Sequence, residues 1–131
     1  ENINHENTTA ETSNEEIGAI KQSDDKPEES KNVQEKNMNE SMRHLSRSLR
    51  FFYAGDFREA LKEVDLSLEL KPDLALAYAR RGSIYYKLGD VQRATINWNL
   101  ALRLDPEYDD VRNILKALHE NRLKDANLFE E

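Results

Sequence analysis

Residues 75–108, ALAYARRGSIYYKLGDVQRATINWNLALRLDPEY, decide the fold of this chain. Glycine at position 89 can take the left-handed conformation that ends a helix, and Asp90 after it can cap the next helix. Pro106 disfavours helix in the residue before it. The stretch therefore predicts two helices, at about 75–88 and 91–104, joined by a tight turn.

The 34 residues in front repeat this pattern. Residues 41–74, SMRHLSRSLRFFYAGDFREALKEVDLSLELKPDL, align with 75–108 without a gap. Self-similarity at a fixed period of about 20–50 residues is typical of helical repeat proteins. The first repeat thus predicts helices at about 41–54 and 57–70. The identical pairs are Arg47/Arg81, Gly55/Gly89, Asp56/Asp90, Ala60/Ala94, Leu66/Leu100, Leu68/Leu102, Leu70/Leu104 and Pro72/Pro106.

A fifth helix is expected after Pro106, at about 109–124. Apolar residues follow the helical period there, at Val111, Ile114, Leu115 and Leu118. Residues 126–131 are expected to fray. Without a partner helix behind it, the fifth helix should act as a solvating cap on the repeats.

The first 37 residues differ in composition from the rest. They are rich in Glu, Asn, Ser, Thr, Lys and Gln, with isolated apolar residues, so they cannot bury enough surface to offset chain entropy. The net charge of −7 lies in residues 1–40, because residues 41–131 hold equal numbers of acidic and basic side chains. We expect a disordered acidic tail or tether at 1–37 and a helical domain at 38–125. A domain without a basic surplus argues against nucleic-acid binding.

The repeat resembles the tetratricopeptide repeat (TPR). The second repeat carries the resemblance best, with small, aromatic and proline residues where that family's motif has them: Tyr78, Gly82, Tyr85, Gly89, Ala94, Trp98, Ala101 and Pro106. In the first repeat Ser48, Val64 and Ser67 depart from the motif. The resemblance implies an all-α fold, with two helix–turn–helix repeats and a C-terminal capping helix in a short right-handed α-solenoid.

Residues for catalysis or metal binding are not recognisable. There is no cysteine, which excludes disulfides and thiol chemistry. His5, His44 and His119 lack the spacing of metal ligands. A calcium loop starting at Asp105 would need glycine and glutamate where Asp110 and Lys116 stand. We expect no enzyme, no cofactor and no metal site, and no apolar run is long enough to insert into a membrane.

The resemblance also implies a binding groove along the first helix of each repeat. Part of its apolar stripe could instead be core, or lie under the N-terminal segment. Some family members hold a chaperone's C-terminal carboxylate with Lys, Asn and Arg. Here Leu45, Leu49, Ala79 and Ser83 occupy such places, which argues against that mode. The expected groove residues are Met42, Leu45, Leu49, Phe52, Tyr53, Leu76, Arg80, Ser83, Tyr86, Lys87 and Asn113.

These observations predict an adaptor that binds a peptide or helix of another protein. The groove could instead serve as a homodimer face. The same features also fit a non-catalytic part of a larger enzyme or regulatory assembly, or a lipid-tethered cell-envelope protein. Because the sequence starts at Glu1 rather than methionine, we expect a processed or excised chain, whose compartment (cytoplasm or cell envelope) is left open.

Overall fold

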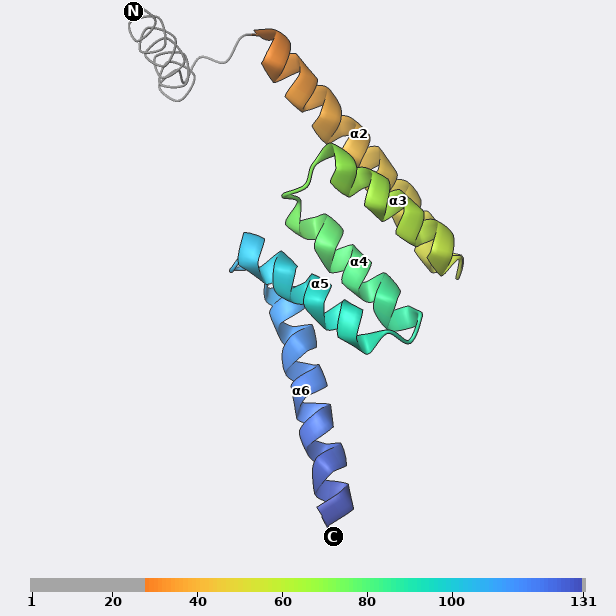
Figure 1. The fold of residues 1–131 in the computed structure, drawn as a ribbon, viewed down its shortest axis with the longest axis vertical. Helices are drawn as coiled ribbons and strands as arrows, with labels where there is room; N and C mark the ends of the chain where they lie inside the picture. Colours follow the sequence, from red (N-terminus) through yellow and green to blue (C-terminus); the bar gives the residue numbers. More distant parts are fainter. Residues whose placement is uncertain (1–27, 131) are drawn as a thin grey trace, which may run out of the picture. The chain divides into compact units, whose positions relative to one another are not determined.

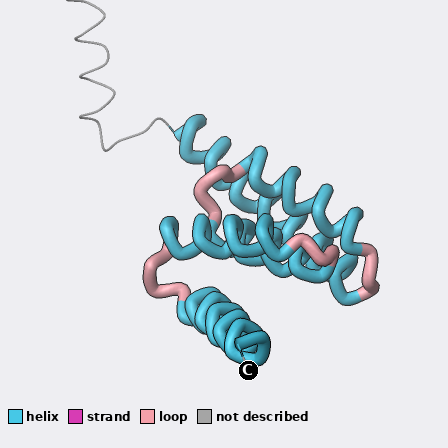
Figure 2. Tube along the Cα trace, turned by 60° about the horizontal axis from the view of Figure 1, so that its bottom comes forward, coloured by secondary structure: helices cyan, strands magenta, loops and turns pink. Residues whose placement is uncertain are grey.

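The computed structural model describes the backbone of residues 28–130 and the side chains of 28–122. Over this range the chain is helical with short connecting loops (Figures 1 and 2). In Figure 1, α2 runs antiparallel to α3, and α4 runs antiparallel to α5. The expected all-helical fold of paired helices is thereby confirmed. The helices are α2 (Glu28–Tyr53), α3 (Phe57–Leu70), α4 (Ala75–Lys87), α5 (Val91–Leu104) and α6 (Asp109–Glu130).

The start of α2 differs from the expected domain boundary. The chain divides into two units, residues 1–35 and 36–131, and the described part of the first unit is the beginning of α2. Residues 28–37 are helical, so the expectation that they belong to a disordered tail is wrong. No glycine or proline stands between residues 28 and 53 to stop a helix, and Glu28 and Glu29 suit the positive end of its dipole. The remainder of the expected tail, residues 1–27, lies outside the described residues.

The last helix is also longer than expected. Helix α6 continues to Glu130, so the prediction that residues from 126 onward fray is wrong up to residue 130. The physical reason is the same, because no glycine or proline follows Pro106. Good helix formers without a breaker leave the sequence no marked end.

The turns between the paired helices follow the expected chemistry. Gly55 and Gly89 take positive φ values of 82° and 86°, which a residue with a Cβ atom adopts at a cost. The Oδ1 atom of Asp90 accepts a hydrogen bond from the backbone N–H of Arg93 at 3.0 Å, as a capping residue should. Asp56, the equivalent residue of the first repeat, could cap α3 in the same way, but its side chain makes no such bond.

Two apolar clusters hold the second unit together, and α4 contributes to both. The first joins α2, α3 and α4 through Leu45, Ala60, Val64, Leu68, Ala77 and Ile84. The second joins α4, α5 and α6 through Ala79, Ala94, Trp98, Ala101 and Val111. Each repeat alone lacks enough apolar surface for a core, so the sharing of α4 is what makes the array cohesive.

Candidate functional site

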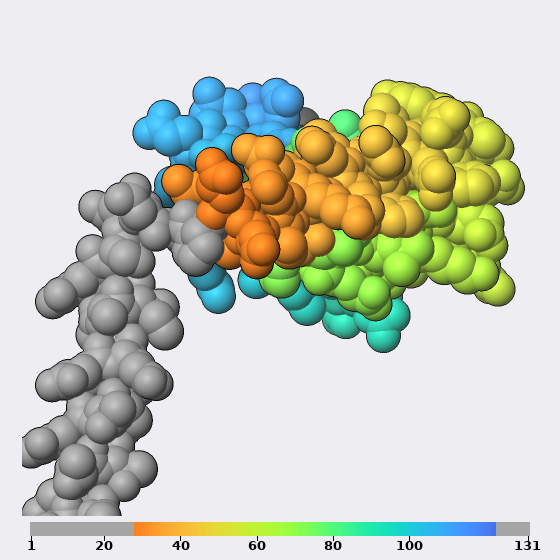
Figure 3. Space-filling view, turned by 90° about the horizontal axis from the view of Figure 1, so that it is seen from above, coloured from red at the N-terminus to blue at the C-terminus, as the bar shows by residue number. Residues whose placement is uncertain are grey.

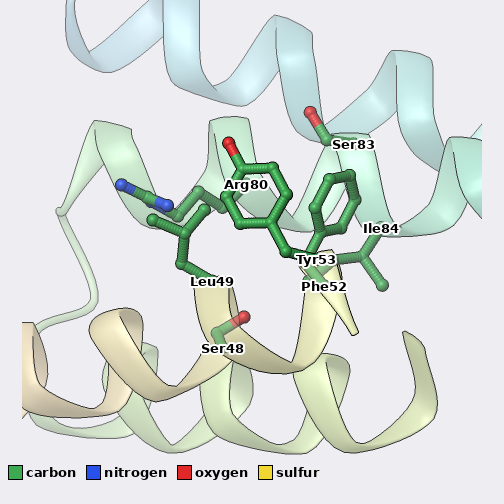
Figure 4. A pocket seen from close by; sticks show the side chains of 7 residues that line it. All are labelled: Ser48, Leu49, Phe52, Tyr53, Arg80, Ser83 and Ile84. Carbon is green, nitrogen blue, oxygen red and sulfur yellow. The ribbon is translucent and has the colours of Figure 1, made fainter. Parts of the chain in front are cut away.

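The first helices of the repeats enclose a hollow between α2 and α4. It has a volume of about 200 Å³ and is lined by Ser48, Leu49, Phe52, Tyr53, Arg80, Ser83 and Ile84. Figure 4 shows these side chains reaching from both helices into the space between them. One wall is apolar and aromatic, and the other carries a guanidinium and a hydroxyl group.

A second hollow continues from the first toward α6. Its volume is about 330 Å³. The two hollows share Phe52 and Ser83, so together they form one groove along α2, α4 and α6. The second hollow is lined by Phe52, Ser83, Tyr86, Lys87, Trp98, Ile114, Ala117, Leu118 and Asn121.

Large aromatic side chains border this groove without being covered. Tyr53 is 79% exposed and Tyr86 is 47% exposed. Their rings lie against neighbouring rings, Tyr53 at 5.7 Å from Phe52 and Tyr86 at 5.9 Å from Trp98, measured between centroids. Aromatic rings held in place with one open face bury much area on a partner with little loss of freedom.

Trp98 reaches the second hollow because α4 has glycine beneath it. A Cβ atom at position 82 would lie 2.5 Å from both Cδ1 and Nε1 of the indole. The indole N–H donates to the carbonyl oxygen of Ala79 at 3.1 Å, which fixes the ring against α4. Gly82 therefore lets a ring from α5 fill part of the wall between the first helices.

Arg80 is the unusual group of the groove. Its Nε atom is buried and has no hydrogen-bond partner, and no carboxylate among residues 28–122 forms an ion pair with it. The phenol of Tyr108 lies within reach of its charge: burial raises the pKa of Tyr108, while Arg80 acts in the opposite direction. A buried donor without an acceptor carries a desolvation cost that a bound acceptor would remove.

The structure brings most of the expected groove residues together. Leu49, Phe52, Tyr53, Arg80 and Ser83 line the first hollow, and Tyr86 and Lys87 line the second. Met42 is 37% exposed and lies beside Ser46, in a separate hollow on α2. Asn113 and Asp110 are exposed on α6 but line neither hollow of the groove.

Other expected residues belong to the core. Leu45 is only 1% exposed and sits in the first cluster, so its assignment to the groove surface is wrong. It lies on the same face of α2 as Ser41 and Ser48, both of which are buried. Leu76 is half-buried and packs against that cluster. Ala79 is 7% exposed.

Five lining residues were not expected from the sequence. They lie outside the places that the resemblance assigns to the groove: Ser48, Ile84, Trp98, Leu118 and Asn121. The helical period could have added Leu118 and Asn121, which follow Ile114 and Ala117 by four residues on α6. Trp98 stands on a second helix, and only the glycine opposite it hinted that its ring reaches across.

Together the paired antiparallel helices and the groove along their first members define a helical-repeat protein. Residues 75–108 match the tetratricopeptide repeat family, so this part of the chain is a tetratricopeptide repeat (TPR). The family's repeat is typically non-catalytic.

Two similar proteins are informative about the fold. A 56-residue stretch is 34% identical to the Hsp70-Hsp90 organizing protein of Triticum aestivum, and it covers 43% of this chain and 10% of that protein. The first TPR of Spaghetti (RPAP3), solved bound to the HSP90 peptide SRMEEVD, is 22% identical with a TM-score of 0.59. That match covers 63% of this chain and 66% of the other. At this identity the structural likeness shows the fold alone.

The described region offers neither a membrane span nor a metal centre. No described helix is long and apolar enough to cross a membrane. No group of three or more His, Cys, Asp or Glu residues within the described part is arranged to hold a metal ion.

Proposed function

We propose that this protein is a non-catalytic interaction module whose groove binds a peptide or helix of another protein. The observation that carries the proposal is the buried, unpaired Nε atom of Arg80 beside an apolar wall. A bound segment would match both walls of the hollow if it placed an apolar side chain near Leu49 on α2 and an acceptor oxygen near Arg80 on α4. The similarity to a TPR that binds an HSP90 peptide supports a peptide as the ligand.

The ligand is an internal segment of its protein and not a free C-terminus. At the places where some relatives grip a terminal carboxylate, Leu45 is 1% exposed and Ala79 is 7% exposed, and neither side chain can form a hydrogen bond. Leu49 is apolar too. Arg80 is the partly buried cation of the first hollow, and a single Asp or Glu side chain or a backbone carbonyl is the matching acceptor.

Selection from a displayed library of random peptides against the full chain tests this function. We expect the enriched sequences to combine a bulky apolar residue with a nearby Asp or Glu. As a defined probe, the peptide SRMEEVD and its C-terminally amidated form should bind equally weakly. Tighter binding of the free-carboxylate form by tenfold or more, about 1.4 kcal/mol, would show that the terminus is recognised after all.

Variants of groove residues outside the core complete the experiment. Phe52 packs edge-on against Phe57 at 5.6 Å and contacts the core, so its replacement would disturb the fold. We expect Arg80→Gln to weaken a selected peptide about tenfold, since a charged hydrogen bond contributes about 1.5–3 kcal/mol. Tyr53→Ser with Tyr86→Ser should also weaken it about tenfold, because this variant removes the exposed aromatic area of the groove. The matched control is Leu66→Ser with Ile96→Ser, which removes exposed apolar residues from α3 and α5. If the control weakens binding and the groove variants do not, the groove is not the site.

A further inference from the structure

The outer side of α2 carries three arginines on one face. Arg43, Arg47 and Arg50 follow one another at helical spacing and border one hollow together with Asn39, Met42 and Ser46. All three are exposed, and within residues 28–122 none of them forms an ion pair. We call these three residues the arginine face. Figure 3 shows the orange-to-yellow surface of α2 open to solvent along much of its length.

The second repeat shows what the fold does at the same places. The 34-residue offset equates Arg43, Arg47 and Arg50 with Ala77, Arg81 and Ile84. Ala77 and Ile84 are 0% and 1% exposed and belong to the cluster that α4 shares with α2 and α3. In this fold, that face of a first helix is therefore the one on which the preceding helix packs.

An ion pair inside the molecule supplies a template for such contact. Nη1 of Arg81 lies 3.0 Å from Oδ1 of Asp65, and Asp65 stands on α3, the helix that precedes α4. Arg47 is the equivalent of Arg81, but no carboxylate within the described residues meets it. A helix seated on α2 as α3 is seated on α4 would bring its position equivalent to Asp65 opposite Arg47, where a carboxylate could form the same ion pair.

We propose that the arginine face binds a helix of another polypeptide that presents carboxylates along one side. Arginine at the places of Ala77 and Ile84 excludes an apolar helix, because burial would leave two guanidinium groups without acceptors. Guanidinium groups pair with carboxylates in a two-bond geometry that lysine cannot match. Residues 41–131 hold as many acidic as basic side chains, which favours a local acidic partner over a nucleic acid or a lipid surface.

Two labelled helical peptides test the proposal against the full chain. In the first, glutamates stand at i, i+4 and i+7 on an alanine and glutamine frame. The second has the same composition with the glutamates on different faces. Fluorescence anisotropy at low salt should show the first binding about tenfold more tightly, because each exposed pair contributes up to about 1 kcal/mol.

Two triple variants of equal charge separate the arginine face from general electrostatics. Arg43→Gln with Arg47→Gln and Arg50→Gln should remove the tenfold preference. Arg58→Gln with Arg103→Gln and Arg122→Gln, all exposed and without ion pairs in the described region, should leave it unchanged. Circular dichroism melts check that both variants fold.

Three results would overturn the proposal. The first is no saturable binding of the patterned peptide at millimolar concentration. The second is equal loss of binding in both triple variants, which would mean non-specific attraction. The third is tighter binding of a single-stranded oligonucleotide or of phosphatidylglycerol vesicles that depends on the arginine face, which would assign it to a phosphate-bearing partner.

Discussion

The two repeats have equivalent helices but close their helix pairs with different interiors. In the first repeat, Ser48 on α2 donates its hydroxyl hydrogen bond to the carbonyl oxygen of Ala60 on α3 at 2.8 Å. Toward the start of α2, the Oγ atoms of Ser41 and Ser67 lie 2.7 Å apart, and the Ser41 hydroxyl is also 3.0 Å from the carbonyl oxygen of Ser67. All of these serines are buried. The crossing of α2 and α3 is thus small, polar and hydrogen-bonded.

In the second repeat a large indole ring packed on a glycine takes the place of the buried hydroxyl groups. Gly82 stands where the first repeat has Ser48, and Trp98 stands where it has Val64. Here the indole of α5 donates to the backbone of α4, whereas in the first repeat the donor is on the first helix and the acceptor on the second. In both repeats, side-chain hydrogen bonds to the backbone of the opposite helix help to fix the crossing, two in the first repeat and that of Trp98 in the second. The two repeats thus join their paired helices with different sets of residues.

The largest effect should come from filling the space beneath the indole. Gly82→Leu places atoms where Cδ1 and Nε1 of Trp98 already lie. The ring is held by its hydrogen bond to Ala79, so it cannot move aside freely. Overpacking costs about 1–3 kcal/mol and occasionally more, and we expect more than about 3 kcal/mol here. Urea denaturation followed by circular dichroism measures it.

The control for this variant puts the same side chain on the surface. Asn99 is exposed on α5, and Asn99→Leu should change the free energy of unfolding by less than about 0.5 kcal/mol. If Gly82→Leu unfolds at the same urea concentration as this control, the tight contact between α4 and Trp98 is not what holds the second repeat together.

Sequence reasoning predicted the repeat and its turns more accurately than the helix ends. The alignment of the two 34-residue repeats predicted α3 and α5 at their observed bounds, 57–70 and 91–104, because glycine, aspartate and proline mark each boundary. Pro27 stands directly before the start of α2 at residue 28 but was not used as a boundary mark, and residue 130 has no such mark, so helix propensity alone extends α6 over good helix formers. The predicted start of α2 was therefore ten or more residues too late, and the predicted end of α6 was several residues too early.

The sequence predicted which helices line the groove, but it did not predict which of their side chains are buried in the core. Repeat places predicted which helices line it, and Leu49, Tyr53 and Arg80 are where they were expected. The sequence could not separate Leu45 from Leu49, because a one-turn apolar stripe faces both the core and the groove edge. Only the packing of α3 against α2 decides that Leu45 is buried. The absence of a hydrogen-bond partner for Nε of Arg80 depends on the tertiary structure, so residue spacing in the sequence could not predict it.

An exchange of residues between the repeats should have the next largest effect. Trp98→Val introduces the first repeat's residue and leaves a cavity above Gly82, at a cost of about 3 kcal/mol. Adding Gly82→Ser restores the first repeat's pair, and the serine hydroxyl can reach the carbonyl oxygen of Ala94, the equivalent of Ala60. We expect the double variant to be more stable than Trp98→Val alone by about 1 kcal/mol.

A double-mutant cycle gives the coupling between these two positions. Residues in contact typically couple by about 0.5–3 kcal/mol, and the sign expected here is favourable for the matched pair. If the destabilising effects of Trp98→Val and Gly82→Ser simply add, the residue pair of the first repeat cannot replace that of the second. The first repeat's crossing would then depend on Ser41 and Ser67 and not on the place shared by Ser48 and Gly82.

The smallest effect concerns the arginine that both repeats share. Its recurrence predicts a role in the fold, and for Arg81 the contacts agree: its Nε donates to Oδ1 of Asn97 at 2.7 Å, and its Nη1 meets Asp65 at 3.0 Å. It therefore ties α4 to both α5 and α3. Arg47 is exposed and makes neither contact, and Glu63, at the place of Asn97, lies 2.6 Å from Nδ1 of His44 instead. For Arg47 no ion pair in the described region supports a structural role.

Replacing each arginine in turn sharpens this difference between the repeats. Arg81→Gln removes a half-buried hydrogen bond and a partly exposed ion pair, and we expect a loss of about 1 kcal/mol. Arg47→Gln removes no contact in the described region and should change the free energy of unfolding by less than about 0.3 kcal/mol, because isolated surface charges contribute little. Urea denaturation at low and at high salt measures both changes in the free energy of unfolding. Only the loss caused by Arg81→Gln should become smaller at high salt, because salt already screens the ion pair with Asp65 in the unsubstituted protein. Equal losses would show that Arg47 already has a structural partner within this chain. The arginine face would then be part of the fold and not free for an acidic helix, so this comparison also decides whether the second binding surface is open.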